Sequence, residues 1–400
     1  MTHSFDQVPD RRNTHSYKWD QSAKLFGDPD ILPLWVADMD FPSPPAVKEA
    51  LIRRAEQGVY GYTFRSDDYA AALVGWLKQR HDWDVTPGEI TDVPGVVTTL
   101  SLCVELFSEP GSPVILQSPV YYPFYDVIKM NGRQVANNPL VIRNGRYEMD
   151  YDHLESLMQG GARLLLLCSP HNPGGRVWER EELERLGELC ARYDVIVASD
   201  EIHADLVLAG HRHIPTATVS ADLAQRTITA MAPTKTFNLP GLQSSYAVIQ
   251  NPELKRRFDY KLKALSIHMM HYFNNDAITA AYTEGGDWLE AMLAYVEENL
   301  AYAIDYLGEH LPQVVPMKPE ATYLLWVDCR GLGRDIAGLK QLMYREARVA
   351  FNEGSVYGDE GSGYLRINVA CPRSVLVEAL ERFCQAAVAA MPNTIPGASI

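Results

Sequence analysis

The chain has 400 residues, 46% of them hydrophobic and 22% charged, which is typical of a globular protein long enough for two domains. Its net charge of −15 argues against a nucleic-acid-binding protein, because such a protein needs a basic face. The first ten residues lack a hydrophobic signal segment, and the longest aliphatic run, Leu164–Leu167, is far too short to span a bilayer, so we expect a cytoplasmic protein without a membrane partner.

The six cysteines form no C-x-x-C pair, and several lie within apolar runs. We therefore expect them to be reduced and buried, as in a cytosolic protein. Two histidine pairs, His211 with His213 and His268 with His271, have no cysteine or carboxylate at ligand spacing. The sequence therefore predicts no metal site.

The first 45 residues are predicted to form an arm that lies across a surface. They include an aromatic and acidic stretch, Leu34–Phe41, and they show neither helical nor clear strand periodicity. Helices are predicted over 46–57 and 69–81. Pro44-Pro45 opens the first of them, since proline is tolerated in the first turn of a helix.

The middle of the chain alternates short apolar strands with helices. After a turn over 95–98, one helix is predicted over 100–107 and an amphipathic one over 179–193. The predicted strands are 114–117, 135–138, 163–168, 195–198, 227–231 and 245–249. Such alternation is typical of an α/β fold in which a mostly parallel sheet carries helices on both faces.

The pattern changes after Gly285-Gly286, where apolar residues at helical spacing from Leu289 to Leu311 predict one long helix. A smaller α/β domain is predicted to follow, with strands over 323–327 and 364–369 and helices over 336–348 and 375–390. The predicted organisation is an N-terminal arm over 1–45 that is part of the small domain, a large domain over 46–286, and a small domain over 287–400 that includes the long linking helix.

Four segments are expected at strand ends, where open α/β sheets bind ligands. The amides from Gly95 to Thr99 form either an anion site or a plain helix cap. Tyr121, in a Pro-aromatic segment, could stack on a planar ring or simply pack in a turn. Asn172 lies in an Asn-Pro-Gly-Gly sequence, which is a turn by composition but could present an amide donor. Asp200 directly follows an apolar strand, where an unpaired carboxylate is costly to bury.

One lysine, Lys235, lies between two predicted strands in a turn that contains Pro233, Pro240 and Gly241. Partial desolvation there would lower its pKa and free the amine as a nucleophile or base, whereas most lysines are solvated surface groups. An anion site, a stacking surface, an amide donor, a buried carboxylate and this lysine together fit an aromatic ring with a phosphate, a ring oxygen, a basic nitrogen and an aldehyde. That ligand is pyridoxal phosphate (PLP).

Nine segments carry a resemblance that runs from Phe5-Asp6 to Cys371-Pro372-Arg373. They are Trp19-Asp20, Leu34–Phe41, Tyr60-Gly61-Tyr62, Pro119–Tyr125, Ser169–Arg176, Ser199–His203, Lys235–Asn238, Ala281–Gly285 and Leu365–Asn368. The chain resembles the MalY/PatB branch of cystathionine β-lyases, or C–S lyases, within class I/II of the aspartate-aminotransferase-like superfamily. The resemblance implies PLP fold type I, in which helices flank a mostly parallel seven-stranded sheet and a smaller α/β domain is added.

The resemblance also implies a role for each residue around the cofactor ring. Lys235 would form the aldimine, and Asp200 would pair with the pyridine nitrogen and keep it protonated. Asn172 would donate a hydrogen bond to the ring oxygen, with His203 at a nearby position. Tyr121 would stack on the ring and join Lys235 and Asp200 as a catalytic residue.

Further roles concern the cofactor phosphate and the substrate. The amides of Val96 and Val97 would hold the phosphate, and Tyr60 would reach the phosphate region of the partner subunit in a homodimer with shared active sites. Arg366 would clamp the substrate carboxylate, a role suited to its planar fork; without the resemblance, an exposed strand arginine is the simpler interpretation. Trp35 and Tyr60 are also predicted to contact the substrate.

The sequence departs from the broad aminotransferase pattern at three positions. Ala232 replaces a common serine, Gln243 replaces an arginine that commonly binds phosphate, and His203 replaces a common tyrosine. The phosphate therefore loses a charged partner. The Asp-Glu-Ile-His form of residues 200–203 is familiar from the C–S lyase branch and favours a lyase.

The function implied by the resemblance is PLP-dependent α,β-elimination. The enzyme would cleave cystathionine or a related L-cysteine S-conjugate to a thiol (homocysteine from cystathionine), pyruvate and ammonia, within methionine and cysteine metabolism. An aminotransferase on the same scaffold is the alternative, because it shares the early steps. A non-catalytic PLP-binding regulatory protein is a third possibility, since a fold does not determine a function.

Overall fold

The computed structural model describes residues 4–391; residues 1–3 of the predicted arm and 392–400 of the predicted small domain lie outside the described residues. A seven-stranded sheet has the order β2-β10-β9-β8-β7-β3-β4. Only β10 is antiparallel to its neighbours, so the prediction of a mostly parallel sheet is confirmed. The strands are β2 (Ile90–Val93), β3 (Pro113–Leu116), β4 (Gln134–Asn137), β7 (Leu164–Cys168), β8 (Ile196–Asp200), β9 (Thr227–Met231) and β10 (Ser245–Ile249).

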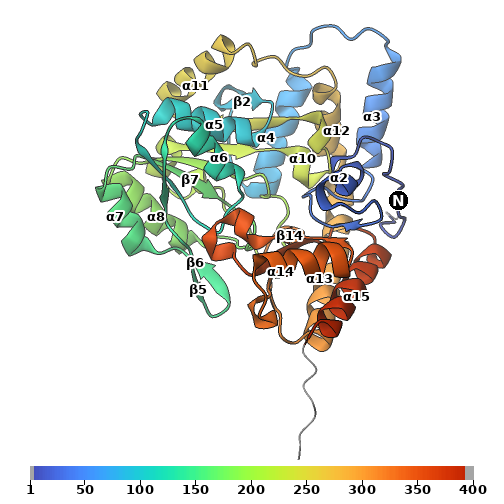
Figure 1. Cartoon of the computed structure of the whole chain (residues 1–400). Helices are drawn as coiled ribbons and strands as arrows, with labels where there is room; N and C mark the ends of the chain where they lie inside the picture. The colour runs from blue at the N-terminus through green and yellow to red at the C-terminus, as the bar shows by residue number, and fades with distance from the viewer. Residues whose placement is uncertain (1–3, 392–400) are drawn as a thin grey trace, which may run out of the picture.

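Alternate residues of the central strands enter two separate hydrophobic cores, as the two-residue period of a strand requires. In β7, Leu164 and Leu166 pack with the helices on one face, while Leu165 and Leu167 pack with those on the other. Both faces are therefore covered, which explains why the strands are continuous apolar runs that the sequence reveals. The helices α5 (Val96–Phe107), α6 (Pro123–Met130) and α11 (Pro252–Ala264) cover the first face, and α7 (Tyr151–Gln159) and α8 (Arg180–Arg192) cover the second (Figure 1).

Five further α-helices belong to this part of the chain. They are α3 (Pro45–Glu56), α4 (Asp67–His81), α9 (Ala221–Arg226), α10 (Pro233–Thr236) and α12 (Asn274–Glu284). The helix α9 packs against α8, and α3 and α4 pack against α12. The sequence did not predict α6, α7, α9, α10, α11 or α12, nor β2 and the hairpin of β5 (Val141–Arg143) and β6 (Arg146–Glu148). The missed strand β2 has two polar residues, Thr91 and Asp92, at its centre, so it lacks the apolar run that marks its neighbours.

The C-terminal part forms a smaller α/β unit at one end of the molecule, orange to red in Figure 1. The long helix is confirmed as α13 (Gly286–His310). A four-stranded sheet has the order β11-β12-β15-β14, and its pairs are antiparallel. The boundaries predicted for the arm, the large domain and the small domain stay predictions. The elements are β11 (Val315–Met317), β12 (Leu324–Asp328), α14 (Ile336–Gln341), β13 (Val349–Ala350), β14 (Asn352–Glu353), β15 (Tyr364–Asn368) and α15 (Arg373–Ala389).

The first 45 residues contain short elements that the sequence does not predict. They contain α1 (Tyr17–Asp20), α2 (Ser22–Phe26) and the two-residue strand β1 (Leu32–Pro33). The Ser16 side chain caps α1 by accepting a hydrogen bond from the Trp19 amide, and Gly27, with φ of 74°, ends α2. The strand β1 pairs in parallel with β13, which attaches the N-terminal segment to the smaller unit.

Two expectations from composition concern cysteines and membranes. All six cysteines are free and buried, as predicted. Within residues 4–391, no helix combines the length and the apolar character needed to cross a bilayer.

Candidate active site

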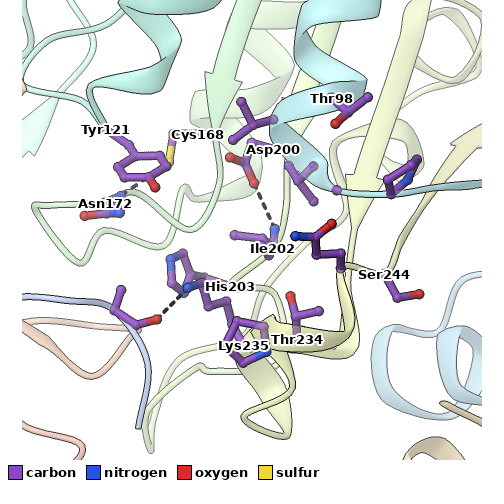
Figure 2. Close-up of a pocket in the computed structure, with 17 residues that line it drawn as sticks. Thr98, Tyr121, Cys168, Asn172, Asp200, Ile202, His203, Thr234, Lys235 and Ser244 are labelled. Carbon is purple, nitrogen blue, oxygen red and sulfur yellow. Dashed lines mark hydrogen bonds between the residues drawn. The ribbon is translucent and has the colours of Figure 1, made fainter. Parts of the chain in front are cut away.

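A cavity of about 330 Å³ lies at the carboxyl edge of the large sheet (Figure 2). The strands β3, β7, β8 and β9 run in parallel, and β2 runs the same way because β10 is antiparallel to both β9 and β2. Segments that follow these strands therefore meet at one edge. The lining residues are Ala37, Pro94, Gly95, Val96, Val97, Thr98, Tyr121, Cys168, Asn172, Asp200, Ile202, His203, Thr234, Lys235, Pro240, Gln243 and Ser244.

Lys235 lies in the short helix α10 directly after β9, rather than in a plain turn, and its side chain reaches the cavity (Figure 2). Its Nζ donates a hydrogen bond to the backbone carbonyl of Ala37. Desolvation lowers the pKa of Lys235 to about 8, although Asp38 partly opposes the shift. A substantial fraction of the amine is therefore neutral near pH 8, as a nucleophile or base requires.

Asp200 ends β8, and its carboxylate is buried with few groups that could stabilise its negative charge. The Ile202 amide donates to Oδ1 at 3.1 Å, and no cation in the described part of the chain forms an ion pair with it. Burial raises the pKa of Asp200 to about 7, against the opposing effect of the Ile202 hydrogen bond. A cation placed beside this carboxylate would lower its pKa again, and a protonated ring nitrogen is such a group.

His203 and Tyr121 supply the neutral ring surfaces of the cavity. Burial lowers the pKa of His203 to about 3, so its imidazole is neutral. Its buried Nδ1 has no hydrogen-bond partner within residues 4–391, which leaves it available to a ligand. Figure 2 shows Tyr121 beside Asn172.

Arg366, on β15, lies behind Asn172 rather than on the cavity lining. Its Nη1 donates to Asn172 Oδ1 at 3.0 Å, and its Nη2 donates to the Trp35 carbonyl at 2.9 Å. Arg366 is 3% exposed, and among the described residues its Nε has no hydrogen-bond partner and no carboxylate pairs with it. The bond also occupies the oxygen of Asn172, so the Asn172 NH₂ is the end that can donate to a ligand.

The helix α5 begins at Val96, so the predicted turn over 95–98 and the predicted helix start at residue 100 are wrong. Val96 and Val97 have modest helix propensity, so the sequence places the start of this helix too late in the chain. Gly95 is the N-cap, and the first-turn amides of Val96 and Val97 have no partner within the helix. They line the cavity with Thr98, and Lys235 is the only cationic lysine or arginine among the lining residues. This end suits an anion held mostly by neutral donors.

Two predicted contacts lie elsewhere in this chain. The Trp35 ring packs against Tyr17 and Phe26, with centroids 5.4 and 5.3 Å away, and does not line the cavity. Tyr60 is 62% exposed, and its hydroxyl donates to the Ala55 carbonyl at 3.1 Å. The contacts of Trp35 and Tyr60 with substrate, and of Tyr60 with a partner subunit, stay predictions.

Several polar atoms of the lining have no role assigned from the sequence. Thr234 and Ser244 add hydroxyls to the cavity, and their only sequence signal is their position in the segment between β9 and β10. Ala37 contributes a carbonyl, which every residue possesses, so its side chain gave no signal.

The donor set fits the cofactor that the resemblance predicts. An unpaired carboxylate fits a protonated ring nitrogen, the Asn172 NH₂ and His203 Nδ1 fit a ring oxygen, and a helix N-terminus fits a phosphate. The partly neutral Lys235 amine fits an aldehyde.

The comparisons with known proteins point the same way. Residues 29–383 match the pattern of the family described as Aminotransferase class I and II. Cystathionine beta-lyase PatB of Bacillus subtilis (strain 168) is 44% identical over 380 residues, or 95% of this chain and 98% of that protein. Protein MalY of Escherichia coli (strain K12) is 35% identical over 376 residues, or 93% and 95%.

Among solved structures, cystalysin from Treponema denticola, described as containing a pyridoxal 5′-phosphate cofactor, has a TM-score of 0.93 and 35% identity. The match covers 97% of this chain and 100% of cystalysin. The predicted fold type I is thereby confirmed. The chain therefore belongs to the aminotransferase class I and II family, in the branch that includes PatB and MalY.

Proposed function

We propose that the chain is a PLP-dependent C–S β-lyase that cleaves cystathionine or a related L-cysteine S-conjugate. The observation that carries the proposal is the partly neutral Lys235 amine in one cavity with the unpaired carboxylate of Asp200. The lyase activity, rather than another reaction of this family, is supported by the 44% identity to a protein named cystathionine beta-lyase PatB.

When bound, PLP supplies an electron sink that stabilises negative charge at the substrate Cα. Lys235 acts as the base: its neutral Nζ removes the Cα proton and becomes an ammonium. The Cβ–S bond then breaks, and the sulfur leaves as a thiolate with the bonding electron pair. The remaining three-carbon fragment is released as aminoacrylate, which hydrolyses to pyruvate and ammonia.

The surrounding residues orient the reacting groups. Asp200 would stay ionised beside a cationic ring nitrogen, Asn172 and His203 would offer hydrogen bonds to the ring oxygen, and Tyr121 would stack on the ring. Val96 and Val97 present amides to the phosphate. These assignments rest on the shared cavity.

Arg366 binds the substrate carboxylate. Support comes from its buried guanidinium, whose Nε lacks a partner among the described residues, since a carboxylate would satisfy that edge. Its bond to Asn172 links the carboxylate site to the ring-oxygen site.

Incubation of the purified enzyme with cystathionine should yield thiol and pyruvate in equal amounts without an added keto acid. An aminotransferase is the second candidate, because the matching family is described as Aminotransferase class I and II. Such an enzyme would need a keto acid acceptor for continued turnover. Thiol and pyruvate can be measured in parallel reactions with and without a keto acid. PLP binding without turnover of any amino acid would instead favour the regulatory alternative.

We also propose that the enzyme is a cytoplasmic homodimer with shared active sites. The segment after α3 exposes several large apolar side chains, which a second copy would cover. They are Val59, Tyr60, Tyr62 and Phe64, with exposed fractions of 75%, 62%, 96% and 79%. Sedimentation should give twice the chain mass of 44.8 kDa. A single-chain mass at micromolar concentration would contradict the dimer and the role of Tyr60 across it.

A further inference from the structure

A segment of the N-terminal part, Leu34–Phe41, lies along the cavity and contacts two of the key cations through its backbone; we call it the strap. The carbonyl of Ala37 accepts the hydrogen bond from Lys235 Nζ. The carbonyl of Trp35, two residues earlier, accepts from Arg366 Nη2 at 2.9 Å. One short piece of chain therefore connects the proposed base with the proposed carboxylate ligand.

Two further carbonyls of the strap accept hydrogen bonds from a residue of β15. Asn368 Nδ2 donates to the carbonyls of both Val36 and Asp38, each at 2.6 Å. These two hydrogen bonds hold the backbone on either side of Ala37, whose carbonyl accepts from Lys235 Nζ.

A compact charge cluster holds the strap at its acidic side chains. Arg11 contacts Asp38 and Asp40 at 2.6 Å each, and Lys18 Nζ lies 2.6 Å from Asp40 and 3.6 Å from Asp38. The Lys18 side chain is 0% exposed. Two cations, of which Lys18 is fully buried, and two carboxylates balance one another, so the cluster anchors the strap without adding net charge.

Asn238 joins the strap to the turn that carries the lysine. It lies three residues after Lys235 with φ of 56°, a left-handed conformation that asparagine tolerates. Its Oδ1 accepts from the Met39 amide at 3.0 Å, and its Nδ2 donates to the carbonyls of Met39 at 3.0 Å and Phe41 at 2.8 Å. These three hydrogen bonds tie the strap and the lysine turn into one unit.

We propose that Asn238 is a positioning residue that holds the strap on the lysine turn and so keeps the Ala37 carbonyl against Lys235 Nζ. The carbonyl thereby retains the amine at the cavity whenever the amine is free. The inference deepens the proposed function, on which it rests, because a lysine that acts as a base must stay in place after it is released.

The test is Asn238→Gly, which preserves the left-handed backbone and the net charge but removes all three hydrogen bonds. Asn144→Gly is the matched control, with φ of 51° in the β5–β6 turn, outside the strap and the cavity lining. The full-length, cofactor-free chain is reductively methylated with formaldehyde and cyanoborohydride over a series of pH values. Mass spectrometry of the Lys235 peptide then gives the pH midpoint of its reactivity.

The wild-type midpoint is expected near the Lys235 pKa of about 8, for which burial is the largest cause. A loosened strap admits water to the amine, so Asn238→Gly should raise the midpoint by about 1 pH unit, toward the ordinary lysine value. The charged groups facing the amine are Asp38 on the strap, Asp200 on β8 and Arg366 on β15. None of them is altered, and the neutral His203 is retained as well.

A midpoint in Asn238→Gly that is unchanged or lower overturns the proposal, as does an equal rise in Asn144→Gly. Thermal unfolding of each variant verifies that it is folded. If Asn238→Gly does not fold, the double variant Lys18→Met/Asp40→Asn loosens the strap at constant net charge and should give the same rise. Because the readout needs neither cofactor nor substrate, a chain without lyase activity can still show the shift, and an active lyase can fail to show it.

Discussion

Replacement of Lys235 by alanine should lower kcat for cystathionine cleavage by about 10³-fold or more, because the variant lacks the base for the Cα proton. The cofactor should also lose its covalent attachment. Borohydride fixes a cofactor that is bound to a lysine, so the peptide that contains position 235 should carry no cofactor after reduction and denaturation. The fold should survive, since the side chain makes one hydrogen bond, to the Ala37 carbonyl, and no ion pair within residues 4–391. Initial rates of pyruvate release, with kcat and KM separated, measure the effect.

The matched control is Lys48→Ala, an exposed lysine on α3. It should leave the rate within the error of the wild-type value. Full activity in Lys235→Ala, with the cofactor still bound covalently, would show that another residue is the base.

Replacement of Asp200 by asparagine should have opposite effects on activity and stability. Activity should fall on the order of 10²–10³-fold, because the neutral amide no longer stabilises a protonated ring nitrogen. The cofactor-free chain should become more stable at pH 8, because the variant no longer buries an unpaired carboxylate.

The pH dependence gives the sign of the stability effect. The pKa of Asp200 rises from an ordinary 3.8 to about 7 on folding. Between these values the folded chain binds more protons than the unfolded one, so this residue destabilises the fold as pH rises from about 4 to 7. The gain in free energy of unfolding from Asp200→Asn should therefore be about 2–4 kcal/mol at pH 8 and should vanish near pH 4.

Denaturant unfolding of the cofactor-free proteins at both pH values measures this difference. Asp152→Asn is the control, because the side chain of Asp152 is 99% exposed. A variant that is equally active, or that is less stable than the wild type at pH 8, would remove Asp200 from its proposed role.

The sequence predicted those parts of the fold whose burial leaves a local pattern. The strands β7, β8 and β9 are covered on both faces, so their apolar runs were recognisable from composition alone. The edge strand β2 was missed because its central residues are polar. The small helices α1 and α2 depend on caps and on packing around Trp35, which no periodicity reveals.

The candidate site was predictable to the extent that side-chain chemistry coincided with strand ends. Asp200 ends β8, whereas Asn172 and Lys235 follow β7 and β9, and the parallel topology brings them together. Contacts made by the backbone carbonyl of Ala37 have no counterpart in the amino-acid type. The position of Arg366 behind Asn172 depends on how the two α/β units pack, which local sequence does not encode.

The most direct measurement is the number of turnovers that the PLP-loaded enzyme completes on cystathionine in the absence of any keto acid. A β-lyase regenerates its cofactor in every cycle. The account therefore predicts many equivalents of pyruvate per subunit, with one thiol released for each pyruvate. Release of one equivalent per subunit of the keto acid derived from cystathionine, with its C–S bond intact and no thiol, would contradict it. Continued release only after a keto acid acceptor is added would identify the enzyme as an aminotransferase.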